Sequence, residues 1–218
     1  MTTPRQLLLG IASVGTALIF VSPAAHASAP TEELRQHVDQ VIKILQRSDL
    51  EGDNKTIERR TAVRKVANDI FDFPETAKRS LGRHWQARTP AEREEFTRLF
   101  ADLLEHAYIS RIDRYSGENV NYVGESMEGD QATVRTKILT KQGSQVPVDY
   151  RMLRQGAHWR VYDVIIEGVS LTANYRTQFN KIIQTSSFDD LVAKLKAKEF
   201  AAPEGANGRG ARETRPAS

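Results

Sequence analysis

Asp163 is the residue whose type and position could most readily do chemistry. It lies in the segment WRVYDVIIEG, where strand alternation places its carboxylate on the same face as Trp159, Val161 and Ile165. A carboxylate in such apolar surroundings has either a raised pKa, as many general bases have, or a partner that stabilises its charge. Two interpretations follow: a general base of isomerase or dehydratase chemistry, or a structural carboxylate paired with a buried arginine, tyrosine or backbone donor.

The histidines beyond residue 27 do not have the spacing of metal ligands. They fall on different expected elements, and no two lie four residues apart on one helix. They are His37, His84, His106 and His158. The chain has no cysteine, which excludes disulfides, thiol nucleophiles and thiolate metal sites. We therefore expect neither a metal nor a cofactor.

Other candidate reactive groups are better explained by helix starts. Glu94-Glu95 and Asp189-Asp190 fall in the first turns of expected helices, where acids favour the helix dipole and adjacent side chains diverge. Ser170 resembles a nucleophile elbow, but the glycine required two residues later is missing. It is placed to cap a helix instead.

The N-terminal segment has the composition of a secretory signal. Arg5 precedes an apolar run from Leu7 to Val21, and small residues end at Ala25-His26-Ala27. The run is shorter than the roughly 20 apolar residues of a spanning helix, so we expect residues 1–27 to be cut off after Ala27. The lack of cysteine also excludes a lipid anchor at the cut.

The rest of the chain predicts one domain and a tail. Residues 28–200 are enough for one compact domain, whereas residues 201–218 carry no large apolar side chain and predict a disordered tail. The formal net charge is +3 with 27% charged residues, so we expect no large basic field for nucleic acid.

Helical periodicity covers residues 31–115 and 170–200. The strongest signal begins at Thr89-Pro90-Ala91-Glu92, a capping box, and continues with apolar residues to about Tyr115. Further caps are expected at Ser170 and Ser187. A helix from Pro90 to Tyr115 would be long enough to back an entire sheet.

Between these helical parts, residues 118–168 alternate in polarity. Val120 and Tyr122 begin one strand, and the apolar sets of two further strands are Ala132, Val134, Thr136 and Ile138, and Val146, Val148, Tyr150 and Met152. Glycine-containing turns separate them. The pattern predicts an α+β fold with a curved antiparallel sheet of about four strands wrapped on the long helix, a cone with an apolar interior.

Four segments together resemble the MlaC family of toluene-tolerance-type periplasmic carriers. They are SLGRHW, FTRLFADLLEHAY, VDYRML and WRVYDVIIEGVSLTANYRTQF, and the likeness runs from about Leu34 to Leu195. The resemblance implies an NTF2-like cone with added N- and C-terminal helices that encloses the acyl chains of a phospholipid. It further implies a monomeric, periplasmic, non-enzymatic carrier that maintains outer-membrane lipid asymmetry.

The resemblance also implies two docking partners, an outer-membrane lipoprotein held by a porin and an inner-membrane ABC transporter with an MCE-domain ring. Two alternatives stay open: a periplasmic enzyme on the same cone using Asp163, and a lipid-free adaptor or chaperone with a filled core. For a carrier, we expect the lipid to contact Phe100, Leu103, Leu104, Tyr108, Val134, Ile138, Val148, Tyr150, Met152, Val164, Val169, Tyr175 and Phe179.

Overall fold

The computed structural model describes residues 29–50, 55–112 and 117–200. In chain order the elements are α1 (Pro30–Leu45), η1 (Ser48–Leu50), α2 (Thr56–Ile70), α3 (Phe73–Leu81), η3 (Gly82–His84), α4 (Pro90–Ile112), β1 (Asn119–Glu128), β2 (Gln131–Leu139), β3 (Gln145–Gln155), β4 (His158–Ile166), β5 (Val169–Ser170), α5 (Leu171–Thr185) and α6 (Phe188–Ala197). This order confirms the expected α+β class. The signal segment 1–27, the tail 201–218 and the expected helix end near Tyr115 lie outside the described residues.

Helices α4, α5 and α6 begin where the sequence predicts, because a side chain caps the free amides of each. Before α4, Thr89 Oγ1 accepts from the backbone N–H of Glu92, and the Glu92 carboxylate accepts from the N–H of Thr89. Ser170 before α5 and Ser187 before α6 each accept from the backbone N–H three residues on. The expected roles of both serines as helix caps are confirmed.

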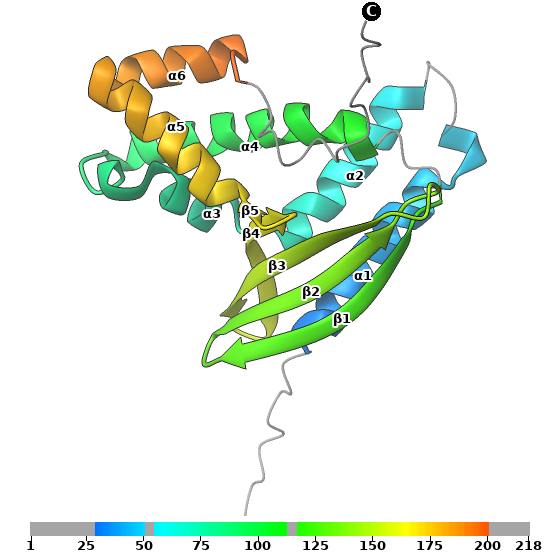
Figure 1. Cartoon of the computed structure of the whole chain (residues 1–218). Helices are drawn as coiled ribbons and strands as arrows, with labels where there is room; N and C mark the ends of the chain where they lie inside the picture. Colours follow the sequence, from blue (N-terminus) through cyan, green and yellow to red (C-terminus); the bar gives the residue numbers. More distant parts are fainter. Residues whose placement is uncertain (1–28, 51–54, 113–116, 201–218) are drawn as a thin grey trace, which may run out of the picture.

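The strands form one antiparallel sheet in chain order, β1 to β5, which curves around α1 (Figure 1). The fifth strand, β5, is a two-residue addition to the four that alternation predicts. It returns on β4 through Glu167 and Gly168, whose φ angles are 49° and 83°. Glycine adopts such a positive φ without strain, which permits the tight turn that leads into α5.

An irregularity in β4 changes the side on which Asp163 lies. Arg151 pairs with Asp163, but the next residue of β3 pairs with Val161, so Tyr162 is an extra residue in β4. This bulge turns Asp163 to the face opposite Val161 and Trp159. The expectation that these three share one face is wrong, because alternation assumes a strand without insertions.

The buried apolar side chains form two clusters. The helical cluster joins α3, α4, α5 and α6 and comprises Ala77, Leu81, Phe96, Leu99, Phe100, Leu103, Tyr175, Phe179, Phe188, Leu191, Val192 and Leu195. The sheet cluster joins α1, α2 and the sheet and comprises Leu34, Ile70, Ala132, Val134, Val148, Met152, Trp159, Val161 and Val164. We call the sheet face that contributes to this second cluster the inner face.

The helix around which the sheet curves is α1. Leu34 of α1 packs in the sheet cluster, and Val38 packs against it. The longer helix α4, expected to back the sheet, instead packs mainly against α3 and α6, and its buried residues belong to the helical cluster. Periodicity shows that a helix has an apolar face, but it does not show which element covers that face.

Candidate functional site

Of the thirteen residues predicted to contact a lipid, eleven belong to the two clusters or pack against them. The helical cluster holds Phe100, Leu103, Tyr175 and Phe179, with Leu104 partly buried against it. The sheet cluster holds Val134, Val148, Met152 and Val164, with Ile138 and Tyr150 partly buried against it. Tyr108 and Val169 are partly buried outside both clusters. The fold therefore divides most of the predicted residues between the helical cluster and the sheet cluster and does not gather them in one place.

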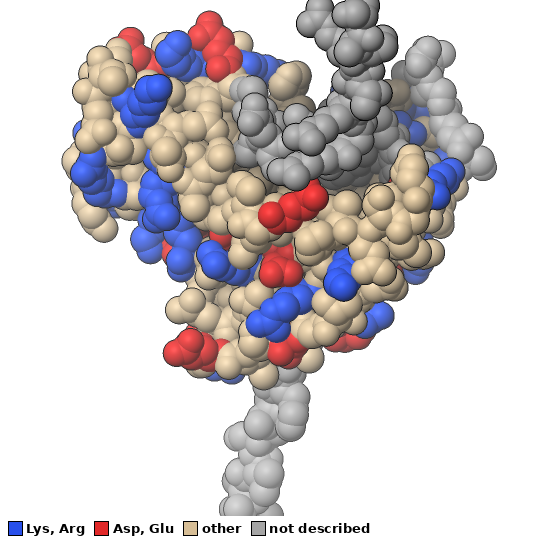
Figure 2. Space-filling view, viewed as in Figure 1, with Lys and Arg blue, Asp and Glu red and all other residues tan. Residues whose placement is uncertain are grey.

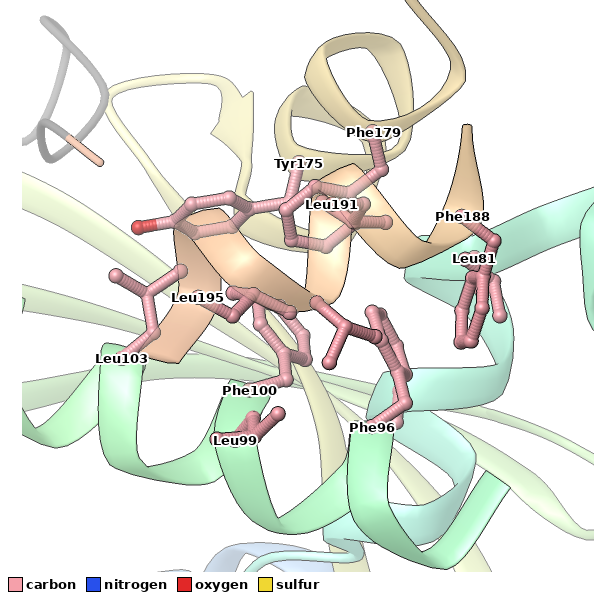
Figure 3. Close-up of a cluster of buried hydrophobic side chains, with 12 residues drawn as sticks. Leu81, Phe96, Leu99, Phe100, Leu103, Tyr175, Phe179, Phe188, Leu191 and Leu195 are labelled. Carbon is pink, nitrogen blue, oxygen red and sulfur yellow. The ribbon is translucent and has the colours of Figure 1, made fainter. Parts of the chain in front are cut away.

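Phe179 lies among the rings of the helical cluster (Figure 3). Its ring centroid is 5.6 Å from that of Phe96, 5.3 Å from that of Phe100 and 5.6 Å from that of Tyr175. Phe96 and Phe100 meet it edge to face, and Tyr175 stacks on it. Aromatic pairs of this kind add stability beyond that expected from the apolar area they bury, so the contacts between these rings stabilise the packing of α5 against α4.

The sheet cluster is covered unevenly along the strands. Near the β3–β4 turn, Met152 and Val161 are both 0% exposed. From the middle of the sheet toward the β2–β3 turn, apolar side chains of the inner face are only partly buried. We name this region, together with Val38 of α1 and Leu171 of α5 that also pack there, the half-covered surface; its sheet residues are Tyr122, Ile138, Val146, Tyr150 and Ile166. Partly exposed apolar surface on the side toward which a sheet curves is suited to a hydrophobic ligand.

Only Ile138 and Tyr150 of the half-covered surface were predicted as site residues. The alternation of β3 also places Val146 on the inner face, and that of β1 places Tyr122 there, so this signal could have identified both. Ile166 could not be assigned in the same way, because the bulge at Tyr162 changes the alternation of β4.

The phenol groups of Tyr150 and Tyr122 have altered acidity. Burial raises the pKa of Tyr150 to about 12. Burial also raises the pKa of Tyr122, with a further contribution from the neighbouring Tyr150. Both effects penalise the phenolate, so both phenols are neutral at physiological pH and can donate hydrogen bonds.

These shifts predict a loss of stability at alkaline pH. An unfolded tyrosine ionises near pH ~10, so the stability due to a raised folded pKa is fully present below that pH and is lost as pH rises through about 12. We expect the free energy of unfolding to fall over this window, and to fall less in Tyr150→Phe. Urea denaturation at pH values from about 8 to about 12 measures both slopes. If the free energy of unfolding fell with pH equally steeply in the parent and in Tyr150→Phe, the burial of the Tyr150 phenol would be contradicted.

The Asp163 carboxylate is 2% exposed and accepts three hydrogen bonds. Oδ1 accepts from the backbone N–H of Thr172 at 3.0 Å, and Oδ2 accepts from Ser170 Oγ at 2.7 Å and Arg151 Nη1 at 3.3 Å. Two of these donors stand at the start of α5, so the carboxylate joins β4 to that helix. The arrangement matches the structural interpretation, in which a partner stabilises the charge.

Glu33 is a second buried carboxylate, which the sequence did not predict. It is 7% exposed; Oε2 accepts from the backbone N–H of Trp159 at 2.9 Å, and Oε1 lies 2.9 Å from His158 Nδ1. The contact ties the start of α1 to β4. An acid in the first turn of a helix is normally solvated, so its type and position did not indicate burial.

His37 lies next to this contact, with its Nδ1 2.7 Å from the backbone oxygen of Glu33, whereas His84 and His106 lie elsewhere. His84 Nε2 is 2.9 Å from the side-chain oxygen of Asn180, and His106 is exposed on α4. Within residues 29–50, 55–112 and 117–200, no three histidine, aspartate or glutamate side chains converge in a way that could hold a metal ion.

The outer surface carries charges of both signs. Figure 2 shows acidic and basic side chains interspersed over the face in view, with lysines and arginines more frequent over the side formed by α3 and α5. The exposed basic residues of these two helices are Lys78, Arg176 and Lys181. In the described part of the chain, no helix combines the length and the apolar character needed to cross a membrane.

Comparison with known proteins gives matches over most of the domain. The family model of the MlaC protein matches residues 35–197. The intermembrane phospholipid transport system binding protein MlaC of Haemophilus influenzae is 23% identical over 190 residues, which cover 83% of this chain and 86% of the relative. The toluene tolerance protein ttg2D of Pseudomonas putida is 22% identical over 130 residues, 59% of this chain and 60% of the relative.

A solved structure shares the fold. It is the phospholipid-binding protein from Ralstonia solanacearum in complex with a phospholipid, with a TM-score of 0.69 and 25% sequence identity. The similarity covers 78% of this chain and 97% of that one. A protein of similar fold to this chain therefore holds a phospholipid.

Proposed function

Because this chain belongs to the MlaC family, we propose that it is a periplasmic carrier that shuttles phospholipids between the outer and inner membranes and so maintains outer-membrane lipid asymmetry. The observation that carries the proposal is the phospholipid held by the Ralstonia solanacearum protein of similar fold. The partly buried apolar residues on the inner face of the sheet support it, because they supply the surface that acyl chains need.

The energetics of lipid transfer explain why a carrier needs such a surface. Exposing one methylene to water costs about 0.8 kcal/mol, so one chain of about sixteen carbons costs on the order of 12 kcal/mol. Two chains make unaided transfer through water negligible. A carrier therefore takes the chains out of water and returns a similar free energy on delivery, with no covalent step.

We place the acyl chains against the half-covered surface, with Leu104, Tyr108 and Val169 as further contacts. Arg64 of α2 forms an ion pair with Glu105 of α4. This contact holds the part of α4 that carries Leu104 and Tyr108 against α2, and α2 itself packs in the sheet cluster through Ile70. The fully buried members of the predicted set, such as Phe100 and Val148, then form the layer behind this surface. They contact the chains when the clusters separate to admit a lipid.

The mechanism that we propose needs no acid, base or metal. Asp163, the candidate general base, points away from the inner face and is engaged by three donors. Its position favours a structural role over isomerase or dehydratase chemistry.

The proposed location and partners rest on the family. We propose that the chain is cut after Ala27, acts in the periplasm as a monomer, and exchanges lipid with an outer-membrane lipoprotein–porin complex and an inner-membrane ABC transporter with an MCE-domain ring. The exposed basic residues Lys78, Arg176 and Lys181 of α3 and α5 support transient docking on that side, because surface charges speed the encounter with a partner of opposite charge.

Organic extraction of the purified mature protein followed by mass spectrometry tests the proposal. We expect phospholipid in a stoichiometric ratio to protein. A protein that is folded, emerges without lipid and takes none up from vesicles would instead be an adaptor or chaperone, and the carrier proposal would fail.

Larger side chains in the space proposed for the acyl chains should lower the lipid occupancy of the protein. Ile138→Trp on the half-covered surface and Leu104→Trp beside it place a larger side chain where the acyl chains are proposed to lie, and a steric cost of about 1–3 kcal/mol should weaken lipid binding by at least about fivefold. Val123→Trp is the matched control, because Val123 is 53% exposed on β1. Circular dichroism checks folding, and extraction measures the lipid. Unchanged occupancy in both folded filling variants would show that the pocket lies elsewhere.

A further inference from the structure

Tyr122 stands at the boundary between the apolar inner face and the solvent. It lies on β1 opposite Thr136, and its ring packs against the sheet cluster. The guanidinium carbon of Arg35 lies 4.2 Å from the centroid of the same ring, and Arg35 itself is exposed. The ring therefore contacts both the apolar sheet cluster and a charged, exposed side chain.

The hydroxyl group of Tyr122 is buried without a hydrogen-bond partner among the residues that the structure describes. A buried hydroxyl that makes no hydrogen bond is costly, and phenylalanine at this position would fill the same space without that cost. A tyrosine hydroxyl is neutral at physiological pH, and burial raises the pKa of Tyr122 further, so the hydroxyl is available as a donor. A buried donor with no partner in the described part of the chain would gain a hydrogen bond from a ligand that brought an acceptor to it.

A diacyl phospholipid carries such acceptors at the boundary between its hydrocarbon chains and its head group. Its two ester carbonyls lie between the hydrocarbon chains and the charged head group. Tyr122 likewise lies between the apolar inner face and the exposed Arg35. A carbonyl oxygen accepts from a phenol O–H, whereas the methylenes deeper in the lipid cannot.

Resting on the carrier function proposed above, we propose that Tyr122 Oη donates a hydrogen bond to an ester carbonyl of the bound lipid and so selects ester-linked lipids and sets the depth to which they enter. Tyr122 is then a specificity-determining residue of the half-covered surface, alongside the apolar contacts that supply most of the affinity.

The proposal predicts opposite effects on stability and on binding. Tyr122→Phe removes only the hydroxyl, so the lipid-free variant should unfold at the same temperature as the parent or up to about 4 °C higher. The parent should bind dimyristoyl phosphatidylglycerol about threefold to tenfold more tightly than the dialkyl ether analogue with the same chains, the effect of one neutral hydrogen bond. Tyr122→Phe should bind both lipids with the weaker affinity.

Tyr162→Phe is the matched control, because it removes a phenol hydroxyl from the bulge of β4, where Arg79 stacks on the ring. It should keep the preference of the parent for the ester lipid. Fluorescence titration of lipid-stripped protein measures the affinities. A parent that binds ester and ether lipids equally, or a Tyr122→Phe variant that keeps the full preference, would overturn the role of Tyr122 while leaving the carrier function standing. A parent that binds neither lipid would overturn both.

Discussion

Replacing Asp163 by alanine is expected to lower the free energy of unfolding by about 3 kcal/mol, because the change leaves three donors without their acceptor. The Thr172 N–H and the Ser170 hydroxyl then lose the contact that joins β4 to α5. The half-exposed Arg151 contributes least, since water can solvate it. For a domain of this size the loss corresponds to a fall of about 6 to 12 °C in the melting temperature.

Thermal and urea unfolding of the mature protein measure this effect, with Asp102→Ala as the matched control. Asp102 forms an exposed pair with Arg98 on α4, so its removal should change stability by less than about 0.5 kcal/mol. Asp163→Asn should leave the lipid content of the folded protein unchanged. A variant that is fully stable but loses turnover of a substrate would restore the general-base interpretation.

The second large effect is expected at Phe179, whose replacement by alanine should cost about 3–5 kcal/mol. The ring is 0% exposed and meets those of Phe96, Phe100, Tyr175 and Phe200, the last at 5.5 Å. Removing it leaves a cavity where α4 and α5 meet, and the surrounding rings can close it only in part.

Urea denaturation of lipid-free protein measures this cost, because bound lipid would add its own stabilisation. Ile57→Ala is the control: Ile57 is 78% exposed, so the change should alter stability by less than about 0.5 kcal/mol. A cost below about 1 kcal/mol for Phe179→Ala would mean that the helical cluster is not filled in the lipid-free protein, and that it belongs to the lipid pocket itself.

Much of the fold could be predicted from local patterns. The capping box at Thr89 and Glu92 and the cap at Ser187 locate helix starts, since they satisfy backbone amides within a few residues. Alternation located β2 and β3 and identified Ile138 and Tyr150 on the inner face. The residues shared with the MlaC family predicted the fold class and the kind of ligand that the relatives bind.

The sequence by itself therefore determined most of the elements, the apolar faces of the helices and of β2 and β3, and the family, because hydrogen bonding and periodicity act between residues close in the chain. Only the tertiary structure decided which faces meet: α1, and not α4, packs beneath the sheet, and the bulge at Tyr162 turns Asp163 away from the inner face. Such pairings depend on contacts between distant segments and on a single inserted residue, which no local pattern encodes. The burial of the Tyr122 hydroxyl without a partner in the described part of the chain is likewise a property of the folded protein alone, since only packing determines which polar atoms lose their water.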